Sequence, residues 1–213
     1  MNCEFPSVTV TLDDEALIVH SVEPMMAITS SITGGGVLPA RYILNMNVDK
    51  KYYCNSPADG LAFFARSRGI NESFHGFMTA VYMNKTKSVT LRGQGVTVTA
   101  LVTAGVSNAT SAGISEPASF TPGTINIILL VDANLTHAAL VNAVITATEA
   151  KTASLQEKNI HTPNGLSATG TSTDAICIAC TGRGDPINYA GSATVVGWLM
   201  ARAVRECLAS ALV

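Results

Sequence analysis

Apolar residues either alternate with polar ones or run together in segments of strand length along most of the chain. Alternation is typical of a strand with one buried face, and a short continuous apolar run is typical of a strand buried on both faces. These patterns predict strands over 8–12, 16–22, 42–48, 87–91, 95–103, 123–132 and 174–180. The continuous apolar run over 123–132 is expected to lie centrally in its sheet.

Other segments predict helices. Pro57 suits the first turn of a helix that ends at Arg68. A longer helix over 138–157 contains no Gly or Pro, and Thr136 is placed to cap it. A last helix is expected over about 192–211.

The chain shows no tandem repeat, low-complexity linker or break in composition, so we expect one domain over 1–213. The predicted fold class is α/β, a mixed β-sheet packed with a long central helix and a C-terminal helix. The run Gly34-Gly35-Gly36 predicts a loop that needs a positive φ or a close approach between backbones.

Composition narrows the class of partner. Charged residues make up 13 % of the chain, apolar residues 47 %, and the net charge is −2. Because Lys and Arg are few and scattered, we expect no nucleic-acid partner. No apolar run reaches the ~18 residues that a membrane span needs, and the N-terminus lacks a signal-peptide pattern. Five cysteines, an odd number, suit a reducing cytoplasm. The low charge also leaves apolar area for a homodimer.

Segments rich in Thr, Asn and Gly adjoin the predicted strands at 103–109, 123–126, 168–174 and 189–191. Strand ends are where open α/β sheets build sites, and hydroxyls, carboxamides and backbone N–H groups suit a neutral ligand that bears amides. Each segment alone is better explained as a turn, whereas the set leaves both interpretations open. The stretch 169–173 has neither GK[ST] nor GxGxxG and precedes a strand, which argues against a nucleotide site.

The long helix offers two candidates for catalysis. Glu149 shares a polar stripe of the helix with Asn142 and Thr146. This stripe is either the solvated face of the helix, or it lines a cleft in which Glu149 is the general base. Lys151 lies on the other side of the helix, where it extends to solvent or meets a partner, so it cannot act beside Glu149. The mainly apolar side is predicted to hold Val141, Val144, Ile145, Thr148, Thr152 and Leu155.

Asp174 follows the Thr-rich segment and opens a buried strand. Its carboxylate could polarise a water or the hydroxyl of Thr171 or Thr173, or it could only bind N–H groups of the loop. No GxSxG elbow occurs, which argues against a serine hydrolase of that type.

The cysteines and histidines give little support for a metal site. Cys177 and Cys180 lie three apart in a predicted strand, so they point to opposite faces and cannot share one zinc ion. The histidines show no HxH or HxxxH spacing. His137, in the first turn of the long helix, is the histidine that we expect nearest to a site.

Taken together, the segments resemble the adenosylcobinamide amidohydrolase family over about residues 30–205. One departure is Ser172, where the family carries a glycine; if that glycine supplies a positive φ, serine would tighten the loop. The stretches that carry the resemblance are Gly34-Gly35-Gly36, Leu44-Asn45, Met78-Thr79-Ala80, 103–109 (TAGVSNA), 123–126 (GTIN), 148–151 (TEAK), 168–174 (ATGTSTD) and Tyr189-Ala190-Gly191.

The resemblance implies hydrolysis of the amide that joins a propionyl side chain of the corrin ring to aminopropanol. The products would be adenosylcobyric acid and 1-amino-2-propanol, used in coenzyme B12 salvage. The corrinoid is then the substrate, and we expect no cofactor and no metal of the protein's own. Two other classes are a corrinoid-binding module without catalysis and a structural protein, and the ordered polar segments make the structural protein the weaker alternative.

The resemblance assigns no catalytic residue, so the roles come from the residues themselves. We assign the base and proton transfer to Glu149 or Asp174, and Thr171 or Thr173 is the alternative nucleophile. The loop 169–173, together with Asn108 or Asn126, is expected to donate hydrogen bonds to the oxyanion. Lys151 is the alternative donor. The residues expected to bind substrate are Asn45, Thr79, Ser107, Asn108, Thr124, Asn126, Thr169, Gly170 and Tyr189.

Overall fold

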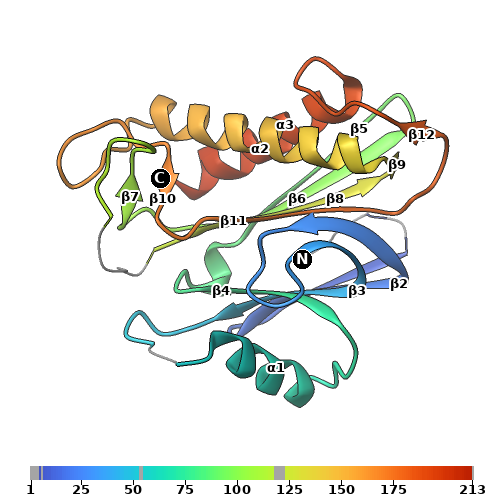
Figure 1. Ribbon diagram of the computed structural model, residues 1–213, viewed down its shortest axis with the longest axis horizontal. Helices are drawn as coiled ribbons and strands as arrows, with labels where there is room; N and C mark the ends of the chain where they lie inside the picture. The colour runs from blue at the N-terminus through green and yellow to red at the C-terminus, as the bar shows by residue number, and fades with distance from the viewer. Residues whose placement is uncertain (1–4, 6, 53–54, 118–122, 213) are drawn as a thin grey trace.

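The computed structural model describes residues 5, 7–52, 55–117 and 123–212 (Figure 1). Every strand that the hydrophobic pattern predicts is present, and the second and third extend well beyond the predicted ranges. These strands are β1 (Val8–Leu12), β2 (Ala16–Thr29), β3 (Gly36–Asn47), β5 (Lys87–Gly93), β6 (Val96–Ala104), β8 (Ile125–Asp132) and β11 (Ala175–Cys180). The predicted helices are α1 (Pro57–Ser67), α2 (His137–Glu157) and α3 (Val195–Ala211).

The sequence pattern missed β4 (Phe74–Thr79), which contains a glycine and no alternation. It also missed the 3₁₀ turn η1 (Met83–Lys85) and the two-residue strands, which are too short to carry a period. Those short strands are β7 (Ala109–Thr110), β9 (Asn134–Leu135), β10 (Gly170–Thr171) and β12 (Pro186–Ile187).

The main sheet has eight strands within the described residues, in the order β4-β3-β2-β11-β8-β6-β5, with β1 added to β2. The pairs β3–β4 and β8–β11 are parallel, and the other pairs are antiparallel. The sheet is therefore mixed, as predicted. β8 lies between β11 and β6, which confirms its central position.

The sheet bends so that its two halves face each other, with helices on both outer surfaces (Figure 1). α2 and α3 cover the outer face of β6, β8 and β11. The inner core joins residues of β2, β3 and β4, such as Ile43 and Phe77, to residues of β6 and β8, such as Leu101 and Ile128. α1 covers the outer face of β3 and β4 through Leu61 and Ala65. The bend coincides with a bulge in β2 between His20 and Met25.

The predicted cap of α2 is confirmed, but its predicted faces are partly wrong. The Thr136 hydroxyl accepts a hydrogen bond from Ala139 N at 3.3 Å. Val141 and Ile145 are about half exposed, whereas Thr146, assigned to the polar stripe, is buried and its hydroxyl donates to Ala190 O at 2.9 Å. Four of the eight buried residues of α2 are alanines, whose small side chains let the helix lie close to the sheet.

Two other local predictions are confirmed. Cys177 packs in the inner core and Cys180 in the core beneath α2 and α3, so their side chains lie on opposite faces of β11. Gly34 has a φ of +71°, and a Cβ there would come within 2.4 Å of Phe74 O, so the glycine loop lies directly on β4. None of the described helices is both long and apolar enough to cross a membrane.

Candidate active site

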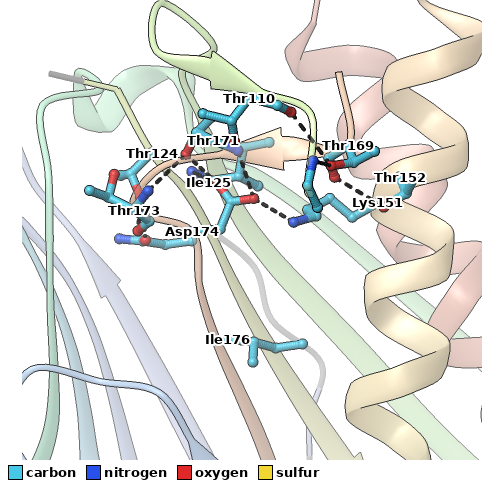
Figure 2. Close-up of polar contacts among 12 residues, drawn as sticks. Thr110, Thr124, Ile125, Lys151, Thr152, Thr169, Thr171, Thr173, Asp174 and Ile176 are labelled. Atoms are coloured by element: carbon cyan, nitrogen blue, oxygen red, sulfur yellow. Dashed lines mark hydrogen bonds and ion pairs between the residues drawn. The ribbon is translucent and has the colours of Figure 1, made fainter. Parts of the chain in front are cut away.

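Three of the four polar segments, 103–109, 123–126 and 168–174, meet at one end of the sheet, where β8 and β11 begin and where β4 and β6 end. The loop before β11 crosses this end of the sheet and carries Thr171, Thr173 and Asp174 (Figure 2). It is held by β10, which pairs with β7 through the partners Gly170–Thr110 and Thr171–Ala109. The C-terminal half of α2 lies beside the loop and contributes Lys151.

Asp174 is the centre of this arrangement. Its Oδ1 accepts hydrogen bonds from Ile125 N at 3.1 Å and from the Thr171 hydroxyl at 2.5 Å. Its Oδ2 accepts from Thr171 N at 3.1 Å and forms an ion pair with the Lys151 ammonium. A carboxylate offers about four lone-pair sites, so protein donors engage all of its ordinary acceptor positions.

The Lys151–Asp174 ion pair is largely buried, with side-chain exposures of 12 % and 16 %. The sequence left open whether Lys151 extends to solvent or meets a partner. The structure shows a partner, Asp174, which is 23 residues away in the chain. Gly170 makes room for the pair, because a Cβ at that position would lie 2.6 Å from Asp174 Oδ2 and 2.7 Å from Lys151 Nζ. Gly170 is therefore a positioning residue in this geometry.

A buried network of carboxamides and hydroxyls lies beneath the loop. Asn126 Nδ2 donates to Asn45 Oδ1 and to Met78 O, both at 2.9 Å, and Asn45 Nδ2 donates to Thr103 Oγ1 at 3.1 Å. Both N–H bonds of Asn126 are thus used inside the protein, which argues against the predicted oxyanion role. The network ties β3, β4, β6 and β8 together below the site.

The other loop threonines hold the backbone. The Thr124 hydroxyl lies 2.7 Å from Thr173 O, to which it can donate, and the Thr173 hydroxyl donates to Gly123 O at 2.6 Å. Thr169 Oγ1 accepts from Ala112 N at 2.9 Å, and Thr169 O accepts from the Thr152 hydroxyl at 3.0 Å. These contacts fix the loop between β8, β7 and α2.

Two large pockets flank the loop. One, which we call the carboxylate pocket, has a volume of about 770 Å³. The other, the hydroxyl pocket, has a volume of about 840 Å³. The carboxylate pocket is lined by Ser30, Ile32, Val48, Asp49, Lys50, Lys51, Tyr52, Pro57, 77–80, Gly123, Thr124, Asn126 and 172–175. The hydroxyl pocket is lined by 107–111, 114–117, Thr162, Pro163, Asn164, Leu166 and Ser172.

Ser172 lines both pockets, and a smaller pocket of about 210 Å³ shares Ser107 with the hydroxyl pocket and Gly123 with the carboxylate pocket. Asp174 lines the carboxylate pocket and also a hollow of about 160 Å³ that it shares with Lys151. The predicted residues Asp174, Thr173, Thr124, Asn126 and Thr79 therefore share one pocket, and Asn108 and Ser107 line the adjoining one.

Three predicted residues lie apart from this group. Glu149 is exposed on α2, on the side of the helix away from Lys151, as the solvated interpretation of its stripe predicts. Tyr189 is 73 % exposed in the loop after β12, beyond the opposite ends of β8 and β11. His137 begins α2 and is roughly 21 Å from Lys151 along the helix axis, at a rise of about 1.5 Å per residue, so its predicted position near a site is wrong.

Ser172 does not strain its loop. It is absent from the described residues with a positive φ, so the serine needs no left-handed backbone. Its Oγ instead accepts a hydrogen bond from Asn108 Nδ2 at 2.8 Å. Sequence reasoning missed this contact. It also missed Ser30 and Ile32 of the β2–β3 loop and Lys50 of the β3–α1 loop as pocket residues, because these loops are far from the Thr-rich segment in sequence.

Within the described ranges, no group of three or more His, Cys, Asp or Glu side chains is placed to hold a metal ion. The charges nearest the loop instead form the Lys151–Asp174 pair described above.

Comparison with known proteins identifies the relatives of this chain. The model of the adenosylcobinamide amidohydrolase family matches residues 5–213. The adenosylcobinamide amidohydrolase of Methanosarcina mazei is 34 % identical over 202 residues, covering 91 % of this chain and 92 % of that protein. A protein of the same name from Halobacterium salinarum is 34 % identical over 122 residues, 50 % of each chain. The uncharacterised protein MJ1613 of Methanocaldococcus jannaschii is 45 % identical over 93 residues, covering 43 % of this chain and 36 % of that protein. The chain therefore belongs to the adenosylcobinamide amidohydrolase family.

Proposed function

We propose that this chain hydrolyses the amide between the corrin propionyl side chain and aminopropanol of adenosylcobinamide. The products are adenosylcobyric acid and 1-amino-2-propanol, which places the reaction in the salvage of coenzyme B12. The family membership supports the reaction class. The proposal places the enzyme in the cytoplasm, with no cofactor and no metal of its own, and leaves the exposed apolar residues Val141, Ile145 and Trp198 available for a homodimer.

The observation that carries the chemical proposal is the group Thr171–Asp174–Lys151 beside a pocket of about 770 Å³. Covalent catalysis needs a nucleophile within hydrogen-bond reach of a base that a third group orients. Thr171 Oγ1 lies 2.5 Å from Asp174 Oδ1, and Lys151 holds the other carboxylate oxygen. Asp174 is therefore favoured over Glu149 as the base, because Glu149 is exposed and lines neither large pocket.

In the covalent route, Asp174 takes the proton of the Thr171 hydroxyl while Thr171 Oγ1 attacks the amide carbon. The C–N bond breaks, and the proton passes to the leaving nitrogen, which departs as 1-amino-2-propanol. Water then attacks the resulting ester, which releases adenosylcobyric acid and restores the hydroxyl. The hydrogen bond from Thr171 to Asp174 favours this route, because Lys151, the other side-chain donor on Asp174, is paired as an ammonium and has no lone pair with which to attack.

A direct route uses a water of the carboxylate pocket. A water that replaces one of the protein donors on Asp174 gives a proton to the carboxylate, the water oxygen attacks the amide carbon, and the same proton passes to the amine. This route is supported by exposure, because Asp174 lines the pocket whereas Thr171 is only 9 % exposed. In both routes the Ser172 hydroxyl, which accepts from Asn108, keeps its own proton for donation to the carbonyl oxygen.

The decisive experiment incubates the pure protein with adenosylcobinamide and measures free 1-amino-2-propanol by mass spectrometry. Release of the amine at a rate proportional to enzyme concentration is the expected result. Tight retention of intact adenosylcobinamide without release would instead identify a corrinoid-binding module. Absence of both binding and release would eliminate the proposed function.

A second experiment separates the two routes. Thr171→Val removes the nucleophile but keeps the volume of the side chain. The covalent route predicts complete loss of turnover in this variant, together with a corrinoid ester on Thr171 in wild-type protein quenched with acid. The direct route predicts residual turnover and no ester. Thr173→Val is the matched control, because the Thr173 hydroxyl donates to Gly123 O rather than to a base.

A further inference from the structure

The hydroxyl pocket is as large as the carboxylate pocket but has a different chemistry. Ser107, Thr110, Ser111 and Asn164 line it, and Glu116 is its one charged residue among those described. The carboxylate pocket contains Asp174 and also carries Asp49, Lys50 and Lys51. The hydroxyl pocket thus offers mainly neutral hydrogen-bonding groups, whereas the carboxylate pocket carries the Asp174 carboxylate.

Ser172 lines both pockets, and Asn108 lines the hydroxyl pocket beside it. Asn108 is 5 % exposed, and its Nδ2 donates to Ser172 Oγ at 2.8 Å. Asn108 Oδ1 is buried and has no hydrogen-bond partner within the described part of the chain. Asn108 lines the hydroxyl pocket, so a turn of its carboxamide toward the pocket would offer this oxygen to an N–H donor of a ligand.

The wall of the hydroxyl pocket is also coupled to the catalytic loop. β7, which contributes Ala109 and Thr110 to that wall, pairs with β10, which carries Thr171. Thr169 N donates to Thr110 O at 2.9 Å on the same side. A ligand that holds this wall therefore also holds the backbone that positions Thr171 against Asp174.

We infer that the hydroxyl pocket is a second substrate subsite, which binds an amide- or amine-bearing part of the corrinoid remote from the scissile amide. This inference rests on the proposed function. The substrate is larger than the drug-sized ligands that pockets of about 300–1,000 Å³ bury, so one pocket does not enclose it. Two sources share the required N–H chemistry: the carboxamide side chains of the corrin and the amino group of the adenine. Binding there positions the scissile amide at Asp174.

The test fills the pocket from its exposed rim. Asn164→Trp places a bulky side chain in the hydroxyl pocket, which Asp174 does not line. Ser167→Trp is the matched control, because Ser167 is exposed on the same loop but does not line that pocket. Melting temperatures establish that both variants fold. The measured quantities are KM and kcat for adenosylcobinamide and for dicyanocobinamide, which keeps the corrin but lacks adenosine.

The subsite predicts that Asn164→Trp raises KM for adenosylcobinamide at least tenfold, while Ser167→Trp changes it less than twofold. An effect on both substrates identifies the corrin carboxamides as the bound part, and an effect on adenosylcobinamide alone identifies adenine. Equal constants for the two variants would overturn the subsite. If wild-type protein cleaves neither substrate, the proposed function fails, and titration of adenosylcobinamide then decides the subsite: weaker binding by Asn164→Trp supports it, and equal binding overturns it.

Discussion

Each end of the parallel pair β8–β11 carries an aspartate bonded to a threonine hydroxyl and a basic side chain. At the site end, Asp174 binds Thr171 and Lys151. At the other end, Asp132 Oδ1 accepts from Thr181 Oγ1 at 2.9 Å and lies 3.4 Å from the Arg183 guanidinium. The residue types are nearly the same, so the difference between the ends comes from their surroundings.

Burial and the adjoining pocket distinguish the two groups. The Lys151 side chain is 12 % exposed and the Arg183 side chain 49 % exposed. Asp174 also lines the carboxylate pocket, whereas Asp132 lines neither large pocket. An ion pair that water screens contributes little to stability and holds its side chains weakly. Removing one partner of a buried pair, by contrast, is strongly destabilising. The comparison teaches that the environment, rather than the residue types, distinguishes Asp174, the proposed base, from Asp132.

The largest expected effect is on turnover. Asp174→Asn removes the proposed base but preserves the shape of the side chain, so kcat for 1-amino-2-propanol release should fall about 10³-fold. Asp132→Asn is the matched change at the other end and should leave kcat within about twofold. Glu149→Gln should also be near wild type. The proposed difference between Asp174 and the other two carboxylates is contradicted if Asp132→Asn or Glu149→Gln loses as much activity as Asp174→Asn in variants with wild-type melting temperatures.

The next effect is on stability. Lys151→Met leaves the Asp174 carboxylate largely buried without a counter-charge, and the free energy of unfolding should fall by about 3 kcal/mol. Arg183→Met removes an exposed partner of Asp132 and should cost less than about 0.5 kcal/mol. Urea unfolding followed by circular dichroism measures both values. Equal losses in the two variants would show that burial does not separate the ends.

A smaller effect tests the space around the ion pair. Gly170→Ala introduces a Cβ within 2.6 Å of Asp174 Oδ2, so the carboxylate or the ammonium must shift. We expect kcat to fall roughly 10–100-fold, because displacement of a catalytic group by about 1 Å is costly. Gly191→Ala is the control, since nothing lies within 4 Å of the Cβ that it adds. Wild-type kcat in Gly170→Ala would show that the pair tolerates displacement.

The sequence predicted the strands with clear periodicity and the helices with clear caps, because these signals are local. β8 and the Thr136 cap are examples. The site was predictable only as a set of residues, since the contact between Lys151 and Asp174 depends on how a loop crosses the ends of the strands. The position of Tyr189 at the other end was not predictable for the same reason: a polar segment next to a strand does not reveal which end of the sheet it occupies.

The smallest effect concerns a buried polar group without a counter-charge. His75 on β4 is 2 % exposed, and its Nδ1 lies 2.8 Å from Gly34 O. Burial lowers the pKa of His75 below its ordinary value of 6.5. The unfolded chain therefore binds a proton at a higher pH than the native protein does, and stability should decrease as the pH falls below about 6.5.

The slope from this one group cannot exceed about 1.4 kcal/mol per pH unit. Urea unfolding at pH 7.5, 6.5 and 5.5 should show a weaker pH dependence in His75→Gln than in the wild type. His161→Gln, a change at an exposed histidine, should keep the wild-type slope. The same slope in all three proteins would mean that His75 takes up its proton as readily in the native state. In that case β4 and the glycine loop do not shield His75 from water, unlike the surroundings that keep the Lys151–Asp174 pair largely buried.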